Sequence, residues 1–242
     1  MKIGITGSQG FIGSHLTQEL KFQGHKLSFF DLPENDLLKQ GKDLENFVKD
    51  NDVIIHTAAV NRGTDEEIIA GSVVAVYNLI SAIKKLKKRP KLIFLSSIQA
   101  ETDTLYGMAK KMAEIILEDF SKKNKAPVSI FRLTNVFGEG CRPFYNSVIA
   151  TFCYQVANNQ DLKINGNSKF KFIYIGDLIK IINKELKIER KNNFYLKKVS
   201  SVNEVSISDL ARIIQSFKNK PKLKSKFHKI LYKTYLSYKN GK

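Results

Sequence analysis

The sequence is poor in the residues that build disulfide frameworks, flexible linkers and membrane anchors. Its two cysteines, Cys141 and Cys153, are too few for a disulfide framework and lack the C-x-x-C spacing of a zinc site. Five prolines and 14 glycines in 242 residues exclude collagen-like and linker-like chains. No apolar run reaches the ~18 residues of a membrane span, and residues 1–20 lack the regions of a signal peptide. We therefore expect a reduced, cytoplasmic protein with no membrane insertion and no bound metal.

Acidic residues are scarce as well. The chain holds 40 Lys and Arg against 23 Asp and Glu, a formal net charge of +17. Sixteen of the basic residues, but only four acidic ones, lie in residues 184–242. Such a tail can contact nucleic acid, an anionic membrane surface or a phosphorylated substrate. No nucleic-acid-binding motif accompanies the charge, so we expect no nucleic-acid partner and attribute the lysines mainly to a biased composition.

Short apolar runs alternate with amphipathic segments over the first 140 residues. Helical spacing is seen at residues 11–22, 66–86 and 105–122, and runs of strand length occur at residues 2–6, 26–30, 53–56, 92–95 and 128–131. The alternation predicts βαβ units and therefore an α/β protein with a doubly wound parallel sheet, a Rossmann fold, over residues 1–140. The rhythm then changes, so we expect a smaller C-terminal α/β part, residues 141–242, interleaved with this core.

A glycine-rich turn follows the first expected strand and opens the first expected helix. Gly7 permits the tight turn, Gly10 lets the backbone approach a pyrophosphate, and Gly13 lets the helix pack close to the strand. The helix N-terminus offers N–H groups and partial positive charge to the phosphates. The expected dinucleotide site comprises Gly7, Gln9, Gly10, Phe11, Ile12 and Gly13.

Asp31 stands at the end of the second expected strand, 18 residues after Gly13. A carboxylate at this place can accept both ribose hydroxyls of NAD, and it would repel the 2′-phosphate of NADP. No arginine adjoins it. We predict a cofactor contact at Asp31, with a solvated strand-end residue as the alternative.

Tyr106 and Lys110 form a Y-x-x-x-K pair on one face of an expected helix. A nearby ammonium group lowers the pKa of a tyrosine from about 10, so that the phenol can exchange a proton near neutral pH. Ser96 and Ser97 end the preceding strand, where a hydroxyl can bind a substrate oxygen that gains charge. We choose Ser97 and predict Ser97, Tyr106 and Lys110 as catalytic residues. The alternative for Ser97 is that it only caps the following segment.

Together these motifs resemble the extended short-chain dehydrogenase/reductase superfamily. The resemblance rests on the glycine turn, on Ser97, Tyr106 and Lys110, on an H-x-A-A strand end at 56–59, and on an R-x-x-N-V-x-G segment at 132–138. It implies two more cofactor contacts, Ala58 and Ala59, and a homodimer, since dimers are common in the superfamily.

Further stretches are similar to a narrower family, the capsular-polysaccharide and O-antigen reductases of the UDP-N-acetyl-L-fucosamine pathway. They lie at residues 60–62, 95–100, 145–154 and 231–238. In that family the short-chain domain reduces the C4 ketone of a UDP-2-acetamido-2,6-dideoxy-4-hexulose with NADPH, and a C-terminal cupin domain carries a metal and epimerises C3.

The resemblance therefore implies a nucleotide-sugar 4-ketoreductase whose second part, residues 141–242, belongs to the substrate site. The UDP-sugar contacts it implies are Ser97, Asn135, Arg142 and Asn146. Arg142 could equally be a solvated loop arginine, and Asn146 could equally cap the next helix. The family uses NADPH whereas Asp31 favours NADH, so the expected cofactor is NADP(H) or NAD(H). The chain ends at Lys242, about where the cupin would begin. We expect no cupin domain here, and a separate cupin epimerase is a candidate partner.

Other functions on the same fold are alternatives. A nucleotide-sugar 4-epimerase, which holds NAD through two half-reactions, is compatible with the sequence. A 4,6-dehydratase of this superfamily usually carries Asp-Glu after its active-site hydroxyl residue, whereas this chain has Ile98 and Gln99. A non-catalytic dinucleotide-sensing protein is a further alternative, although such proteins generally lose the Tyr/Lys pair.

Overall fold

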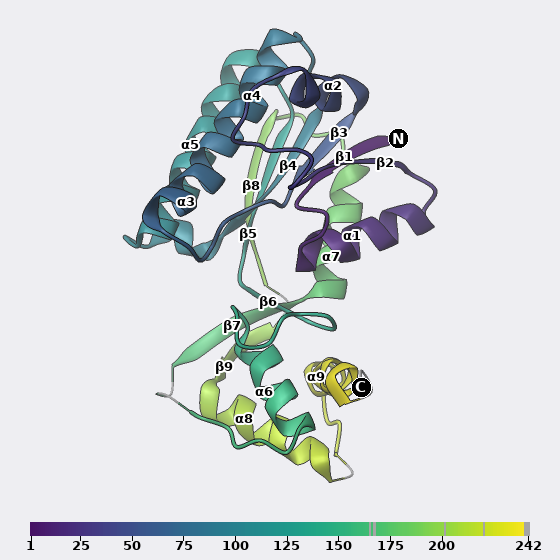
Figure 1. Cartoon of the computed structure of the whole chain (residues 1–242). Helices are drawn as coiled ribbons and strands as arrows, with labels where there is room; N and C mark the ends of the chain where they lie inside the picture. Colours follow the sequence, from purple (N-terminus) through teal and green to yellow (C-terminus); the bar gives the residue numbers. More distant parts are fainter. Residues whose placement is uncertain (165, 167, 201, 220, 240–242) are drawn as a thin grey trace. The chain divides into compact units, whose positions relative to one another are not determined.

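The computed structural model describes residues 1–164, 166, 168–200, 202–219 and 221–239 (Figure 1). The chain divides into two compact units. The first consists of residues 1–133 and 183–198, and the second of residues 134–182 and the chain from 199 onward. The division falls at residue 133 instead of 140, because the strand that begins at Asn135 pairs within the second unit. Each unit is described by itself.

A six-stranded sheet with the strand order β2-β1-β3-β4-β5-β8 forms the first unit. The strands are β1 (Lys2–Thr6), β2 (Lys26–Phe30), β3 (Val53–His56), β4 (Lys91–Ser97), β5 (Val128–Leu133) and β8 (Phe194–Val199). The first five pair in parallel. All residues of β3 and β5 are buried, as expected for parallel strands covered on both faces. The order reverses between β1 and β3, which confirms the predicted doubly wound sheet and marks its topological switch point.

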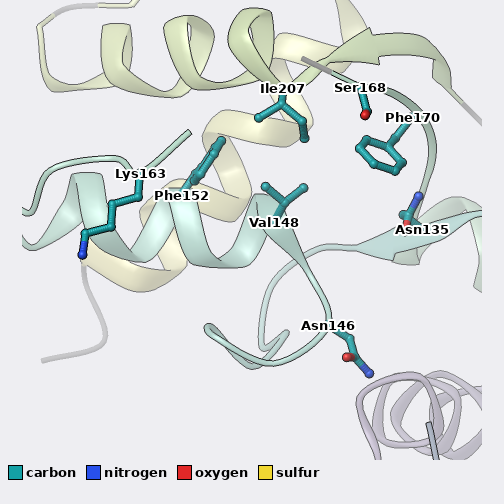
Figure 2. A pocket seen from close by; sticks show the side chains of 8 residues that line it. All are labelled: Asn135, Asn146, Val148, Phe152, Lys163, Ser168, Phe170 and Ile207. Atoms are coloured by element: carbon teal, nitrogen blue, oxygen red, sulfur yellow. The ribbon is translucent and has the colours of Figure 1, made fainter. Parts of the chain in front are cut away.

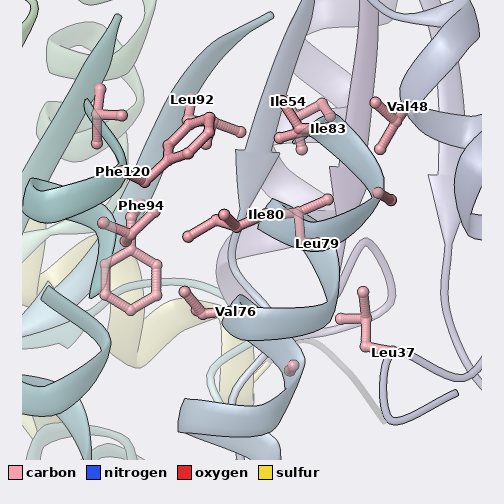
Figure 3. Packing of buried hydrophobic residues seen from close by; sticks show 14 of the residues in the cluster. Leu37, Val48, Ile54, Val76, Leu79, Ile80, Ile83, Leu92, Phe94 and Phe120 are labelled. Atoms are coloured by element: carbon pink, nitrogen blue, oxygen red, sulfur yellow. The ribbon is translucent and has the colours of Figure 1, made fainter. Parts of the chain in front are cut away.

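Helices cover both faces of this sheet. They are α1 (Phe11–Phe22), α2 (Lys42–Asp50), α3 (Asp65–Ile69), α4 (Ala75–Lys85) and α5 (Leu105–Asn124), with a 3₁₀ helix, η2 (Ile98–Glu101). Figure 1 shows α2, α4 and α5 on one face and α1 on the other. Under the first group, Val48, Leu79 and Phe120 pack with Ile54 and Leu92 of the strands (Figure 3). This burial of apolar side chains holds α5 firmly against β4 and β5.

One helical stretch differs from the sequence-based expectation about apolar runs. Between α3 and α4 a π-helical turn, η1 (Ala70–Val74), makes residues 65–85 continuous, and by length and composition alone this stretch could cross a membrane. Its α4 part, however, buries Val76, Leu79 and Ile83 in the core of the first unit. The α4 part of the stretch is therefore a core helix, whereas the α3 part contains no buried residue.

The second unit contains a three-stranded sheet with the order β6-β7-β9. Its elements are β6 (Asn135–Phe137), α6 (Val148–Ala157), β7 (Lys169–Tyr174), β9 (Val202–Ser206), α8 (Ile207–Gln215), the 3₁₀ helix η3 (Ser216–Lys218) and α9 (Lys226–Lys239). β7 pairs in parallel with β6 and antiparallel with β9. The helix α7 (Ile175–Leu186) belongs partly to each unit.

From residue 199 onward, the basic C-terminal segment belongs to this second unit. Helix α9 buries Leu231 and Tyr235 in the apolar core of the unit. Lys233 binds Glu139 at 2.6 Å and Tyr174 at 3.2 Å, and Lys226 lies 3.2 Å from Asp177. Part of the positive charge therefore serves to hold the helix in place.

Candidate functional site

The glycine turn connects β1 to α1 at the switch point of the sheet. Gly7 has φ +76°, and a Cβ there would lie 2.6 Å from the backbone nitrogen of Ala58. A Cβ at Gly13 would lie 2.0 Å from the carbonyl oxygen of Gly7. The packing of the chain itself therefore requires glycine at both positions. At Gly10 a Cβ would meet only the Gly7 carbonyl oxygen, at 3.3 Å, so this position keeps one side open to a close approach.

The N-terminus of α1 suits an anionic group. Gly10 is its N-cap and supplies no side-chain hydrogen bond, and the first turn contains no acidic residue. The N–H groups of this turn, at Phe11 and Ile12, thus keep their partial positive charge available to a phosphate. Gln9 precedes the cap and is exposed. The described residues fit a dinucleotide pyrophosphate at this place.

Asp31, which follows β2, reaches the same turn. Its carboxylate accepts hydrogen bonds from the backbone N–H groups of Gly7 and Ser8, the latter at 3.0 and 3.1 Å, and from the Ser8 hydroxyl. Asp31 is therefore a tethered, half-buried carboxylate rather than a solvated strand-end residue. The cofactor contact expected at Asp31 remains a prediction.

Ser96 and Ser97 differ sharply at the end of β4. Ser96 is buried and donates its hydroxyl proton to Glu114 Oε1 at 2.6 Å. Ser97 is half-buried, and its oxygen accepts the N–H of Gln99 at 3.1 Å as the cap of η2. The capping role considered for Ser97 is thus present, yet a capping hydroxyl still has its own proton to donate. The choice of Ser97 over Ser96 agrees with this geometry.

Tyr106 and Lys110 lie one turn apart on α5, as their spacing predicts. The helix starts at Leu105 because the Thr104 hydroxyl oxygen caps it by accepting the N–H of Gly107 at 3.1 Å. Lys110 is only 2% exposed, and its Nζ lies 4.9 Å from the centre of the Phe94 ring and 5.8 Å from that of Tyr106. The ammonium group is thus embedded among aromatic faces.

Burial governs the protonation of this pair. It raises the pKa of Tyr106 to about 12, because the phenolate is disfavoured away from water. It lowers the pKa of Lys110 to about 8, against the opposing charge of Glu114. The expectation that Lys110 lowers the pKa of Tyr106 is therefore wrong. The Lys110 Nζ faces the ring of Tyr106, and burial of the phenol raises its pKa.

His56 ends β3 beside these residues. Its Nδ1 lies 2.7 Å from Thr6 Oγ1, and its ring stacks on Phe94. Burial, with a smaller contribution from Lys110, lowers the pKa of His56 to about 3. His56 is therefore neutral at physiological pH. The two alanines assigned to the cofactor, Ala58 and Ala59, follow it directly.

The second unit holds the other predicted substrate contacts. Asn135 and Asn146 line a hollow of about 350 Å³ in this unit (Figure 2). The helix cap is Ser147, which accepts the N–H of Ala150, so Asn146 does not take the capping role considered for it. The guanidinium of Arg142 stacks over the ring of Tyr145 at 5.4 Å, outside the lining of the hollow.

Sequence reasoning did not assign most of the residues that line this hollow. The lining residues that it did not assign are Phe152, Lys163, Ser168, Phe170 and Ile207. Figure 2 shows Lys163 at one end in this view, and Phe170 and Asn135 at the other. The sequence contained a signal for Phe170. It lies two residues before the buried Phe172 in β7, and residues two apart in a strand share one face of the sheet. Because the two lie on either side of a bulge, Phe170 stays partly exposed.

Three comparisons place the chain among known proteins. Residues 3–196 match the NAD dependent epimerase/dehydratase family. A UDP-2-acetamido-2,6-beta-L-arabino-hexul-4-ose reductase of Pseudomonas aeruginosa is 33% identical over 98% of this chain and 65% of its own length. The capsular polysaccharide assembling protein CapF of Staphylococcus aureus superposes with a TM-score of 0.81 at 30% identity, over 98% of this chain and 65% of CapF.

The chain thus spans about two thirds of the length of these two relatives. The UDP-glucose 4-epimerase of Thermotoga maritima superposes with a TM-score of 0.86 over 100% of this chain and 99% of its own. At 17% identity that likeness shows the fold alone. Because the family match extends over most of the chain and includes the glycine turn, the Tyr106–Lys110 pair and most of the six-stranded sheet, this protein belongs to the NAD dependent epimerase/dehydratase family.

Proposed function

We propose that this protein reduces the C4 ketone of a UDP-2-acetamido-2,6-dideoxy-4-hexulose with NAD(P)H, in the cytoplasmic synthesis of bacterial capsule or O-antigen sugars. The observation that carries the proposal is the pair of half-buried Tyr106 and buried Lys110 on α5, with the Ser97 hydroxyl at the end of the neighbouring strand β4. The similarity to the Pseudomonas reductase supports the substrate class, and the similarity to CapF supports the link to capsule.

The protonation state of Tyr106 suits a ketone reduction, and the similarity to the Pseudomonas reductase supports a reductase over a 4-epimerase. With its pKa raised to about 12, Tyr106 is a neutral phenol near pH 7 and has a proton to give. A ketone reduction needs that proton for the developing alkoxide, whereas an epimerase must first remove a proton from an alcohol. Ser97 donates a hydrogen bond to the same oxygen and stabilises its charge. The 4-epimerase is the second candidate.

The cofactor would be held by residues of the first unit. The glycine turn and the N-terminus of α1 would bind the pyrophosphate, Asp31 the adenosine ribose, and Lys110 the nicotinamide ribose. Bound there, NAD(P)H supplies the hydride that goes to the sugar C4. The tethered carboxylate of Asp31 favours NADH, because a 2′-phosphate would meet a negative charge already fixed by Gly7 and Ser8.

The UDP-sugar would be held by residues of the second unit. The hollow lined by Asn135 and Asn146 combines amide groups with apolar surface, as a nucleotide base requires. Arg142 would bind the diphosphate through charge-assisted hydrogen bonds. Its present stacking on Tyr145 leaves the planar guanidinium ready for such contacts at its edge.

We also propose a homodimer. Met108, Met112 and Ile115 lie at helical spacing on α5, and each is about half exposed. Tyr77 on the neighbouring helix α4 is 57% exposed. An apolar stripe of this kind on two adjacent helices is suited to pack against its own copy around a two-fold axis.

The test is NADH and NADPH oxidation with enzymatically prepared UDP-4-keto-6-deoxy-HexNAc, for wild type and Tyr106→Phe. We expect oxidation that requires both the sugar and Tyr106. Interconversion of UDP-sugar epimers without net oxidation would favour the epimerase. Absence of both reactions in a folded protein would contradict the proposal.

A further inference from the structure

Arg132, on β5, joins the two segments that carry the proposed catalytic side chains. It is 7% exposed. Its Nε and one terminal nitrogen donate to the two oxygens of Glu114 at 2.9 and 2.5 Å, and its other terminal nitrogen donates to Glu101 at 2.6 Å. Glu114 lies one helical turn beyond Lys110 on α5. Glu101 is the last residue of η2, the 3₁₀ helix that Ser97 caps.

Glu114 extends this network to β4. It is buried and accepts the hydroxyl proton of Ser96, the residue before Ser97, at 2.6 Å. One carboxylate thus ties α5 to two adjacent strands. A buried ion pair of this kind contributes little net stability, because desolvation offsets the attraction. The planar, bidentate guanidinium instead fixes distances and angles between the segments it joins.

A second feature shows that η2 and α5 must meet closely. A Cβ at Gly107 would lie 2.2 Å from the carbonyl oxygen of Gln99 and 2.6 Å from Thr102 Oγ1. Thr102 Oγ1 also donates to that carbonyl oxygen at 2.8 Å and lies 3.0 Å from Thr104 Oγ1, at the cap of α5. The first turn of α5 is therefore in direct contact with η2 beside Tyr106, and the Arg132 network holds the two segments from another direction.

We propose that Arg132 is a positioning residue that, through Glu101 and Glu114, holds the Ser97 segment in register with the helix of Tyr106 and Lys110. The inference rests on the proposed reductase function. Proton donation from Tyr106 and hydrogen bonding from Ser97 must converge on one substrate oxygen, so a small shift between η2 and α5 lowers the rate without removing a binding contact.

Glu101→Ala is the most direct test, because this carboxylate is 43% exposed and its loss leaves the buried Arg132–Glu114 pair intact. We expect kcat to fall about tenfold, with the KM values for ketosugar and NADH changed less than about twofold. Hydrogen exchange of the backbone amides at 98–102 should become faster. Arg132→Lys, which loses the fork geometry, should lower kcat in the same way.

Two controls separate this effect from general loss of charge. Glu118→Ala removes a carboxylate that is 41% exposed and bound to Lys122 at 2.7 Å on the same helix. Lys198→Met removes the other partner of Glu101, also at 2.7 Å. Both variants should retain wild-type kcat. An equal loss of kcat in Lys198→Met would overturn the role of Arg132.

A folded Glu101→Ala variant with wild-type kcat and unchanged exchange would also overturn the inference. Failure of the reductase proposal is recognised separately, because wild type and Tyr106→Phe would then both lack turnover. In that case hydrogen exchange decides. Faster exchange at 98–102 in Glu101→Ala and Arg132→Lys, but not in the controls, supports the positioning role, and unchanged exchange refutes it.

Discussion

Lys110 Nζ lies over the face of the Tyr106 ring, 5.8 Å from its centre. The aromatic ring therefore shields the ammonium group from water on one side, as Phe94 does on another. Burial makes Tyr106 a weaker acid and Lys110 a stronger one, to pKa values of about 12 and about 8. The pair is thus poised with the proton on the phenol, which is the state that a ketone reduction consumes.

Replacing Tyr106 tests this role directly. Tyr106→Phe removes the proton donor while keeping the ring that packs against Lys110, so we expect kcat to fall by about 10²–10⁴-fold. Binding of NADH, followed by fluorescence, should remain. Tyr77→Phe, which changes an exposed tyrosine on α4, is the matched control and should behave as wild type. Full turnover in Tyr106→Phe would exclude Tyr106 as the acid.

Lys110 should destabilise the protein at neutral pH. Its folded pKa of about 8 lies below the ordinary 10.5, so the unfolded chain binds more protons between these values and stability rises with pH across that window. At pH 7 the full penalty is present. Lys110→Met should therefore raise the free energy of unfolding on the order of 3 kcal/mol at pH 7.

Urea denaturation of both proteins at pH 7 and near pH 10 checks this prediction. The difference between variant and wild type should shrink at the higher pH, where Lys110 is neutral in the folded state. Lys111→Met, which removes a half-exposed lysine on the same helix, should show little change at either pH. A pH-independent gain in Lys110→Met would show that the effect comes from packing and not from charge.

Asp31 should set the choice between the two nicotinamide cofactors. Asp31→Ala removes the carboxylate that repels a 2′-phosphate, so the ratio of kcat/KM for NADPH over NADH should rise at least about tenfold, or ~1.4 kcal/mol. Asp50→Ala, an exposed carboxylate at the end of α2, serves as the control. The steady-state rates with both cofactors give the answer, and an unchanged ratio would remove Asp31 from the cofactor site.

The C-terminus of α5 offers a stability test independent of function. Lys125 caps this helix in the left-handed conformation, with φ 49°, which costs an L-residue more than glycine. Lys125→Gly should therefore stabilise the protein by about 1 kcal/mol. Lys123→Gly, inside the helix two residues earlier, should instead destabilise by about 1 kcal/mol. Thermal unfolding of the two variants should shift in opposite directions.

The proposed homodimer depends on the apolar stripe of α5. Met112→Lys places a charge at its centre and should convert the dimer to a monomer in sedimentation or light-scattering measurements. Leu38→Lys, which changes an equally exposed residue in the loop before α2, should leave the dimer intact. A wild-type protein that is monomeric at micromolar concentration would contradict the proposal.

Much of the secondary structure of the first unit could be predicted from local patterns of apolar residues in the sequence. The expected strands at 2–6, 26–30 and 53–56 and the helix at 11–22 coincide with β1, β2, β3 and α1. In a sheet covered by helices on both faces, continuous apolar runs indicate the strands and helical spacing indicates the helices. The second unit was harder, because its short strands form one parallel and one antiparallel pair and join segments far apart in the chain.

Part of the candidate site could likewise be predicted from the sequence, and part could not. The period of an α-helix alone places Tyr106 and Lys110 on one helix face. Gly7 and Gly13 are required by close contacts of the backbone at the turn between β1 and α1. The lining of the hollow around Asn135 could not be read in advance. It is assembled from β6, α6, β7, α8 and the segments that precede α6 and β7, and these elements meet only in the packed unit.

The sequence by itself therefore determined the doubly wound sheet, the glycine turn and the face shared by Tyr106 and Lys110, because these depend on backbone geometry and on neighbours a few residues away. Only the tertiary structure decided that Asp31 is tethered to the turn, that Ser96 is committed to Glu114, and that Arg132 links η2 to α5. It also decided the pKa values of Tyr106 and Lys110. Those properties depend on burial and on partners distant in the chain, and no local pattern specifies how much water a folded protein leaves around a charge.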